Sequence, residues 1–224
     1  PSSWLLKSKS SKTFGQANPH VQTNIKTYKN PEYIQTICLG DRQKEQQKVT
    51  PTTWFQYASL SKTIATAFAL EYFKKNNIPL ETPVNELLSQ TKSPFRLKAE
   101  EYIQSNLAEQ VLLKHLIDHT ALNLHYVNGY PANGSMPPLE ELLVDVKVIG
   151  IPGENFNYSG GGFLVLEHLI EAHSGKNIQE LTENILNDFS FNPKTIPQVE
   201  YAYGYNTNAD EIPGTRFMFP SFAA

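Results

Sequence analysis

The sequence predicts a domain of mixed α and β structure, on the strength of three observations. The chain has 224 residues, 40% apolar and 18% charged, which is the composition of one ordinary globular domain or of part of a larger one. Residues 33–39 are β-branched and aromatic, and they predict a strand. Residues 59–75 place apolar side chains at helical spacing, and they predict a helix.

Charge and hydropathy exclude two classes of partner. The 19 basic and 22 acidic side chains give a net charge of −3, so the chain lacks the electrostatic footprint of a nucleic-acid-binding protein. The sequence has no apolar run of roughly eighteen residues, so no membrane span is predicted. The single cysteine, Cys38, forms neither an internal disulfide nor a zinc site by itself. We therefore expect no nucleic acid, no membrane span, no cofactor and no metal.

The first half of the chain divides into a tail and the start of the domain. Residues 1–20, rich in lysine and serine, are predicted to be a flexible lead-in with at most one short helix near Trp4, and residues 21–224 to be the domain. The strand at 33–39 ends at Gly40, and residues 41–49 are either its hairpin partner or a loop. The helix at 59–75 is apolar on most faces, so it is predicted to be central and buried.

The second half of the chain is predicted to be largely helical. The loop at residues 123–138 is long enough to be functional rather than a simple connection. Gly175 is predicted to close the helix that precedes it. Five further helices are expected, at residues 84–88, 107–119, 139–147, 162–172 and 178–189.

A Ser-x-x-Lys pattern, from Ser59 to Lys62, opens the helix at 59–75. Positions i and i+3 share a helix face, so the Lys62 amine can reach the Ser59 hydroxyl, as a base reaches its nucleophile. A neutral amine at pH 7 requires burial to lower the lysine pKa by about three units. The alternative is a serine cap with an incidental lysine. Ser89 and Lys92 match the same pattern in a predicted polar loop, so the pattern alone does not distinguish a catalytic serine from a helix cap.

A tyrosine, Tyr158, and three glycines lie between a Pro-Gly turn and the helix at 162–172. The glycine-rich nucleotide-binding patterns are absent from this segment, so the tyrosine is its chemical candidate, as a proton donor or acceptor. The alternative is a capping loop with a half-buried tyrosine. His115 and His119 are spaced like a metal-binding pair, but the sequence indicates no third ligand. We therefore expect His119, with Thr120, to end its helix and fix the next loop.

Three segments taken in order resemble the serine β-lactamase and penicillin-binding-protein superfamily. They are residues 55–63 (FQYASLSKT), 113–120 (LKHLIDHT) and 152–160 (PGENFNYSG). The closest likeness is to the branch of class C β-lactamases, D-alanyl-D-alanine carboxypeptidases and family VIII esterases, and it covers the chain from about Tyr33 onward. The resemblance implies an α+β, β-lactamase/transpeptidase-like fold, in which an antiparallel sheet is flanked by helices and joined by a helical region.

The resemblance also implies a site and an activity. By position, Ser59 is the nucleophile, Lys62 its base and Tyr158 the residue that relays protons to the leaving group. The function implied is a serine acyl hydrolase that forms an acyl-enzyme from a D-amino-acid peptide, a β-lactam or a small ester. The partner is then a small-molecule or peptide substrate, and family habit points to a periplasmic or secreted location. The alternative is a catalytically inactive scaffold or a peptidoglycan-binding protein.

Departures from the family pattern bear on substrate and completeness. Gly160 replaces an asparagine common in the branch, and together with Tyr126 and Tyr130 it is a substrate-binding candidate; packing on the loop surface is the alternative for both tyrosines. The Lys-Thr-Gly or His-x-Gly strand of the family is not found, since His173-Ser-Gly175 is predicted to end a helix. We therefore expect an incomplete domain that lacks its C-terminal sheet segment and has weak or no activity alone. A C-terminal fragment on another chain is a candidate partner that would complete it.

Overall fold

The computed structural model describes residues 23–27, 34–43, 46–55, 57–127, 130–131, 135–183, 201–211, 217–218 and 221–222. The chain forms two compact units, which are described separately. The first comprises residues 1–56, 131–133 and 186–217, and the second comprises residues 57–130, 134–185 and 218–224. The predicted lead-in at 1–20 and the end of the helix predicted at 178–189 lie outside the described residues.

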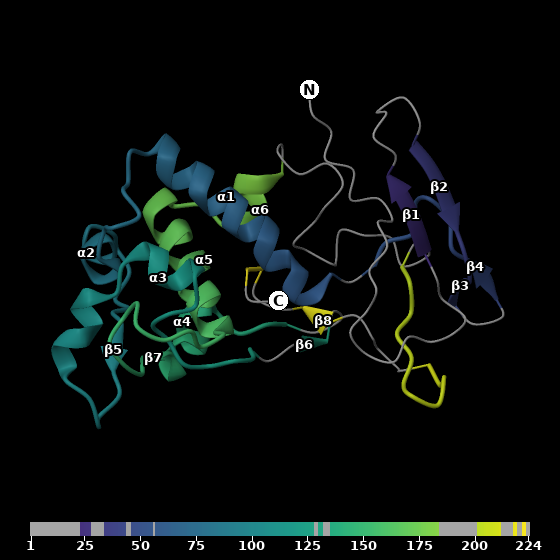
Figure 1. The fold of residues 1–224 in the computed structure, drawn as a ribbon. Helices are drawn as coiled ribbons and strands as arrows, with labels where there is room; N and C mark the ends of the chain where they lie inside the picture. The colour runs from purple at the N-terminus through teal and green to yellow at the C-terminus, as the bar shows by residue number, and fades with distance from the viewer. Residues whose placement is uncertain are drawn as a thin grey trace. The chain divides into compact units, whose positions relative to one another are not determined.

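The first unit contains two antiparallel hairpins (Figure 1). Strand β1 (Thr23–Thr27) pairs with β2 (Ile34–Cys38), which confirms the strand predicted at 33–39. Gly40 turns the chain with a φ of 85°, a value that glycine adopts without steric cost. Strand β3 (Asp41–Gln43) then pairs with β4 (Gln47–Lys48), so the segment at 41–49 is a hairpin and not a loop.

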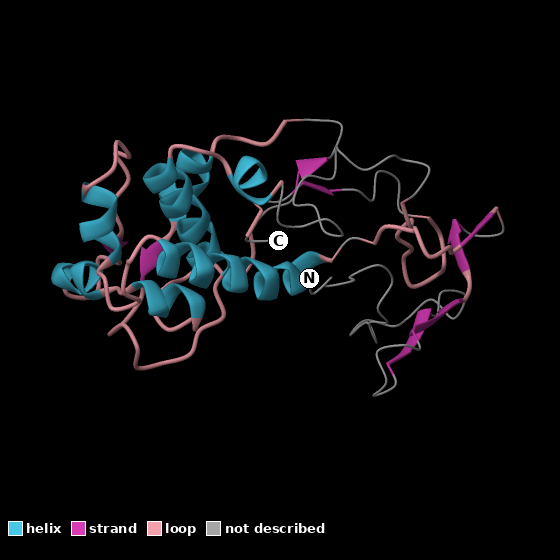
Figure 2. Ribbon diagram, turned by 90° about the horizontal axis from the view of Figure 1, so that it is seen from above, coloured by secondary structure: helices cyan, strands magenta, loops and turns pink. Residues whose placement is uncertain are grey.

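The second unit is helical (Figure 2). Its α-helices are α1 (Ser61–Lys75), α2 (Val84–Ser89), α3 (Leu113–Ile117), α4 (Leu139–Leu142), α5 (Gly160–Ser174) and α6 (Ile178–Thr182). The described residues of this unit also form three short 3-10 helices: η1 (Ala58–Leu60) leads into α1, η2 (Ser105–Gln110) precedes α3, and η3 (Leu143–Asp145) follows α4. Strand β5 (Lys98–Ala99) pairs in parallel with β7 (Lys147–Val148). The two-residue strands β6 (Tyr130–Pro131) and β8 (Phe217–Met218) each have one residue in either unit.

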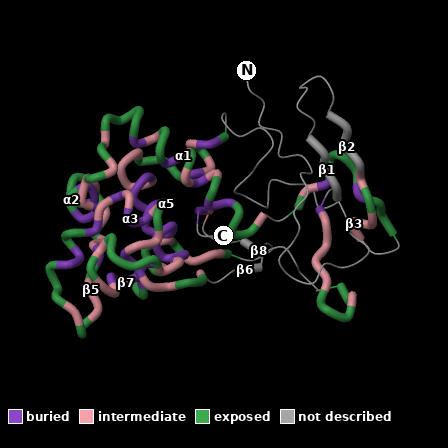
Figure 3. The backbone as a smooth tube through the Cα atoms, viewed as in Figure 1, coloured by how far each residue is buried: buried purple, intermediate pink, exposed green. Residues whose placement is uncertain are grey.

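Helix α5 is the core of the second unit. It packs against α1, α2, α3, α4 and α6, and every residue from Phe163 to Ile170 is at most 4% exposed. In Figure 3 buried backbone, in purple, is visible around α5 and α3. A helix that is buried on all its faces needs neighbours on every side, and the five surrounding helices supply them.

Helix α1 is not the central helix that its apolar pattern predicted. Its buried positions form one stripe that includes Ala65, Ala69 and Phe73, whereas Leu60 just before it and Leu70 are 48% and 39% exposed. The expectation was wrong because the small alanines of α1 face the core while bulkier aliphatic side chains face outward. The completely buried position belongs to α5 instead.

The helix predicted at 107–119 is broken in the structure. The 3-10 helix η2 ends at Gln110, Val111 is extended, and its carbonyl accepts the N–H of Val84 at 2.8 Å, so α3 begins only at Leu113. A tertiary hydrogen bond here overrides helical periodicity. The helix predicted at 139–147 is likewise shorter, because α4 and η3 give way to strand β7. No helix in the described part of the chain is both long and apolar enough to cross a membrane.

Candidate active site

The predicted nucleophile, Ser59, lies in the turn that leads into α1. It is exposed and sits in the middle of η1. The residue before it, Ala58, has a φ of 47°, in the left-handed region that costs an L-residue roughly 1–2 kcal/mol. Strain of this kind persists only where the surrounding structure holds it, and it clusters at functional sites. The turn therefore presents the Ser59 hydroxyl at the surface of the unit in a fixed position.

The predicted base, Lys62, lies one turn further along, inside the protein. Its side chain is buried, and its Nζ lies 3.5 Å from the Ser59 Oγ. Burial lowers the pKa of Lys62 from 10.5 to about 8, because a charged amine loses its hydration there. At pH 7 about a tenth of such amines are neutral. The i, i+3 spacing thus places an activated amine within reach of an exposed serine.

Two aromatic rings lie against the amine. The Nζ of Lys62 lies 5.6 Å from the centre of the Tyr158 ring and 5.7 Å from that of Phe163. Aromatic faces attract a cation, so they stabilise the protonated amine, while burial favours the neutral one. The structure thereby brings Ser59, Lys62 and Tyr158 into one cluster, although Tyr158 is almost a hundred residues from the other two in the sequence.

The Tyr158 ring itself contacts two histidines. His119 stacks on it with ring centres 4.5 Å apart and 28° between the planes, and His125 lies 4.9 Å away. Such offset arrangements of flat rings are favourable beyond the area they bury. The phenol is half-buried, and its ring contacts both imidazoles. His125 was not anticipated from the sequence, because it is six residues from His119 and no short-range pattern joins it to Tyr158.

His119 connects the site to the start of α5. Its backbone has a φ of 61°, and its Nδ1 accepts the N–H of Ser159 at 3.0 Å. Burial, and secondarily the charge of Lys62, lowers the pKa of His119, so the ring is neutral at pH 7. Because Nδ1 is an acceptor, the hydrogen-bond network assigns the ring proton to Nε2. His119 lies beyond the end of α3 at Ile117, as expected for a residue that ends a helix and fixes the next loop.

The loop after His119 binds the first turn of α5. Ser159 caps the helix by accepting the N–H of Gly162 at 2.9 Å, and its hydroxyl donates to the carbonyl of Asn123. Serine is a preferred residue at this position because it satisfies an N–H that the helix leaves unpaired. This cap fixes the residue that follows Tyr158.

The glycines of this turn serve close packing. The N–H groups of Gly160 and Gly161 donate to the carbonyls of His125 and Leu124, at 3.2 and 3.1 Å. A Cβ at Gly161 would lie 3.1 Å from the Asn123 carbonyl oxygen. The N–H groups of Gly160 and Gly161 therefore donate to the adjacent loop. The loop lies so close to the helix that these two positions have no room for a side chain.

The three predicted substrate-binding residues are placed differently from one another. Gly160 is buried two residues beyond Tyr158. Tyr126 is 78% exposed and meets His125 edge-on at 4.4 Å, so it borders the ring stack. Tyr130 begins β6 and is half-buried, and in the described part of the chain no ring contact joins it to the stack.

The histidine pair does not form a metal site in the described chain. His115 accepts the N–H of Leu112 at its Nδ1, at 3.1 Å, and so serves the start of α3. His119 lies outside that helix and does not share its face. Among the residues that the structure describes, no three histidine, cysteine or acidic side chains cluster in a way that could hold a metal ion.

The fold is similar to those of several solved structures. A D-alanine carboxypeptidase from Burkholderia cenocepacia is 20% identical with a TM-score of 0.59, over 85% of this chain and 50% of the other. A class C beta-lactamase is 19% identical with a TM-score of 0.59, over 85% and 51%. A D-amino acid amidase from Ochrobactrum anthropi is 21% identical with a TM-score of 0.59, over 82% and 53%. The chain thus spans about half the length of these proteins.

The similarity of fold agrees with a family model. No curated protein sequence matches the chain. The model described as Beta-lactamase matches residues 31–224, which confirms the predicted resemblance and the β-lactamase/transpeptidase-like fold. The comparisons give no support for a second chain that completes the fold. The chain belongs to the beta-lactamase family, most of whose members are serine hydrolases that act on small substrates.

Proposed function

We propose that this protein transfers acyl groups through a covalent intermediate on Ser59. The observation that carries the proposal is the position of the Lys62 amine, buried, with its pKa lowered to about 8 and its Nζ 3.5 Å from the Ser59 Oγ. Distances at this long limit are common before a substrate binds. A neutral amine beside an exposed serine hydroxyl is what general-base activation requires.

The reaction begins with attack of the Ser59 oxygen on an ester or amide carbonyl. Lys62 accepts the hydroxyl proton, and Tyr158 relays a proton to the leaving alcohol or amine. The backbone N–H of Ser59 is the candidate for one donor to the developing oxyanion. Water, or another amine, then takes the acyl group from Ser59 and restores the hydroxyl.

Covalent labelling tests the nucleophile. The protein is exposed to a fluorophosphonate or a penicillin, its intact mass is measured, and the adduct is mapped by peptide analysis. We expect an adduct on Ser59 that is lost in Ser59→Ala and in Lys62→Ala. Ser89→Ala is the matched control, since Ser89 has the same Ser-x-x-Lys spacing and is exposed at the C-terminal end of α2, not in the polar loop that the sequence predicted. Absence of any Ser59 adduct on folded protein would favour the inactive scaffold instead.

The pH dependence of labelling tests the base. Only the neutral amine of Lys62 accepts a proton, so the labelling rate should rise with pH and reach half its maximum near pH 8. The rate should fall about tenfold for each pH unit below that value. A rate independent of pH between 6 and 9 would exclude Lys62 as the base.

The substrate is proposed to be a D-amino-acid peptide, a β-lactam or a small ester. Solved structures of similar fold include a D-alanine carboxypeptidase, a class C beta-lactamase and a D-amino acid amidase, which supports this range. Gly160, Tyr126 and Tyr130 are the proposed substrate-binding residues, and Tyr126 is the most exposed of them. Comparing turnover of a D-Ala-D-Ala peptide, a cephalosporin and a small aryl ester distinguishes the three classes.

A further inference from the structure

A second serine outside the Ser59 site is bonded to a buried histidine. Ser93 lies in the loop between α2 and β5, and His168 lies in the middle of α5. The Ser93 Oγ lies 2.7 Å from the Nε2 of His168. On the other side of the ring, the Nδ1 lies 3.9 Å from a carboxylate oxygen of Glu140 in α4. A loop and two helices thus place a hydroxyl within hydrogen-bond distance of one imidazole nitrogen and a carboxylate near the other.

The protonation state of His168 follows from its surroundings. The ring is 4% exposed, and this burial lowers its pKa, while the charge of Glu140 raises it. The net direction is downward, so the ring is neutral at pH 7. With the ring proton on Nδ1, the nitrogen on the side of the Glu140 carboxylate, Nε2 is the acceptor for the Ser93 hydroxyl. This is the tautomer in which a histidine removes a proton from a serine.

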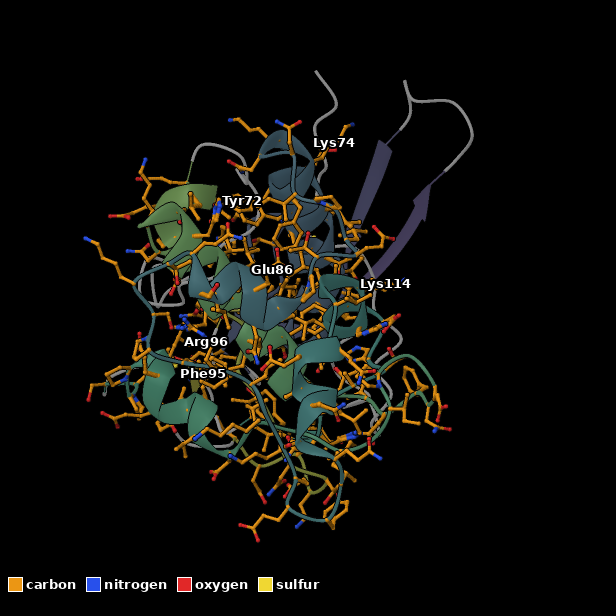
Figure 4. The ribbon with its side chains drawn as sticks, turned by 90° about the vertical axis from the view of Figure 1, so that its left-hand side faces the viewer. Tyr72, Lys74, Glu86, Phe95, Arg96 and Lys114 are labelled. Atoms are coloured by element: carbon orange, nitrogen blue, oxygen red, sulfur yellow. The ribbon has the colours of Figure 1, made fainter. Side chains whose placement is uncertain are left out.

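Neighbouring groups fix both partners. The Ser93 Oγ accepts the N–H of Phe95 at 3.1 Å, and the Phe95 ring meets His168 edge-on at 5.7 Å. Arg96 donates from Nη1 to the carbonyls of Ser93 and Phe95, at 2.9 and 2.5 Å, which holds a cation at the same turn. Figure 4 shows Phe95 and Arg96 beside each other on the face toward the viewer.

The turn lies partly at the surface. Ser93 is half-buried, Lys92 and Pro94 on either side of it are exposed, and the Glu140 side chain is 55% exposed. A reagent approaching Ser93 therefore meets an aromatic ring and a guanidinium, which suit an aryl group and a developing negative charge. Nothing in this arrangement involves Lys62 or Tyr158.

We propose that Ser93 is a second activated serine, acylated by small aryl esters, with His168 as its base and Glu140 as the residue that positions His168. The Ser93 oxygen bonds to the ester carbonyl carbon as His168 takes the hydroxyl proton. The bond to the aryl oxygen then breaks, and that oxygen takes the proton from His168 and leaves as a phenol. Water hydrolyses the acyl-serine, returning the hydroxyl to Ser93 and releasing the carboxylic acid.

The test uses the full chain carrying Ser59→Ala, so that it does not depend on the proposed function of Ser59. The protein is treated with p-nitrophenyl acetate and, separately, with a fluorophosphonate, and adducts are mapped by peptide mass. We expect labelling of Ser93 that His168→Gln lowers about 100-fold and Glu140→Gln lowers by a smaller factor. Ser89 is the internal control, since its exposed hydroxyl donates to the Glu86 carbonyl at 2.6 Å.

Labelling of Ser93 no faster than that of Ser89 would overturn the proposal and leave His168 as a structural contact. Glu140→Gln changes a surface carboxylate, so it tests the assignment even if His168→Gln unfolds the protein. The pH profile is a further readout. Labelling of Ser93 should already be maximal at pH 7, because the pKa of His168 lies below its ordinary value of 6.5. A rate that instead climbs through pH 8 would overturn His168 as the base.

Discussion

Lys62 holds an amine in the first turn of α1 with only 7% of its surface exposed. Its lowered pKa means that folding disfavours the charged form, so the amine that would activate Ser59 also destabilises the native state. In the unfolded chain the pKa returns to its ordinary value of 10.5. Below about pH 8 the native state carries the full free-energy cost of burying the protonated amine. This cost disappears as the pH rises to 10.5.

Replacing Lys62 by methionine should therefore separate stability from activity. Lys62→Met keeps the length and the apolar contacts of the side chain, and we expect it to raise the free energy of unfolding at pH 7 by at most about 3 kcal/mol. Urea unfolding at pH 7 and pH 10 measures this, and the gain should shrink at the higher pH. Labelling of Ser59 should be abolished. A loss of stability at pH 7 would contradict the argument.

Two substitutions of His119 test its two contacts separately: the hydrogen bond from the N–H of Ser159 and the stacking on Tyr158. His119→Phe keeps a ring against Tyr158 but removes the acceptor for the N–H of Ser159, which is 1% exposed. A buried N–H without a partner costs roughly 1–3 kcal/mol, and the positive φ of residue 119 adds strain for phenylalanine, so unfolding in urea should show a loss of at least that size.

His119→Asn retains a residue type that tolerates the positive φ but removes the stacked ring. We expect it to lower kcat between about 10- and 100-fold with little change in KM, because a displaced Tyr158 affects the reaction more than binding. Steady-state kinetics on a small ester measures both constants. An unchanged kcat would show that the stack on Tyr158 has no positioning role.

At the scale of elements, the start of α5 depends on close approach to the loop at 123–125. Helix propensity alone favours alanine over glycine by up to about 1 kcal/mol. At Gly161, however, a Cβ would lie 3.1 Å from both the Asn123 carbonyl oxygen and the Leu124 Cβ. We expect Gly161→Ala to destabilise the protein by about 1–3 kcal/mol and to lower Ser59 labelling, since it pushes the loop away from Tyr158.

The matched control for this substitution is Gly150→Ala. A Cβ at Gly150 meets no atom within 4 Å, and its φ lies outside the left-handed range. In thermal unfolding, the melting temperature of Gly150→Ala should therefore be close to that of the parent protein. Equal effects of the two substitutions would mean that the packing at Gly161 does not determine its cost.

The sequence predicted those parts of the fold that neighbouring residues determine, and it did not predict those that contacts between distant elements determine. The strand at 34–38 and the end of α5 followed from β-branched residues and from Gly175, whose φ is 70°. The break at Val111 was not predictable, because it arises from a hydrogen bond to Val84 on another element. The reversed roles of α1 and α5 were missed because periodicity does not tell which of two apolar helices is surrounded by others.

In the candidate site, too, contacts between residues close in sequence were predictable and contacts between separate elements were not. Ser59 and Lys62 are one helical turn apart, so their spacing predicted the contact that the structure contains. The place of Tyr158 beside them came from the family resemblance, since no spacing rule links residues so far apart. The stack with His125, and the contact of Ser93 with His168, join separate elements and left no signal in the sequence.

At the scale of the whole helical unit, its core contains a carboxyl group among apolar side chains. Glu167 in α5 is 3% exposed, and its Oε2 accepts the N–H of Phe222 at 2.8 Å. Phe222 is fully buried and meets Phe68 of α1 edge-on at 6.1 Å. A residue near the end of the sequence is thereby tied to both α1 and α5. This contact makes the stability of the unit depend on the protonation of one group.

Burial raises the pKa of Glu167 from 4.5 to about 8, with a smaller contribution from Glu171. The native state therefore holds a proton between pH 4.5 and 8 that the unfolded chain releases. The stabilising contribution is complete below pH 4.5 and is lost as pH rises through 8, at about 1.4 kcal/mol per pH unit across the window. An amide has no such proton, while its oxygen still accepts the N–H of Phe222.

Glu167→Gln should consequently remove this pH dependence. We expect the variant to gain stability relative to the parent as pH rises from 5 to 8, as measured by urea unfolding at several pH values. Glu154→Gln, on an exposed residue, is the matched control and should keep the slope of the parent. If Glu167→Gln and the parent lose stability in parallel across this range, the buried carboxyl is ionised in the native state, and the contact with Phe222 is that of a carboxylate.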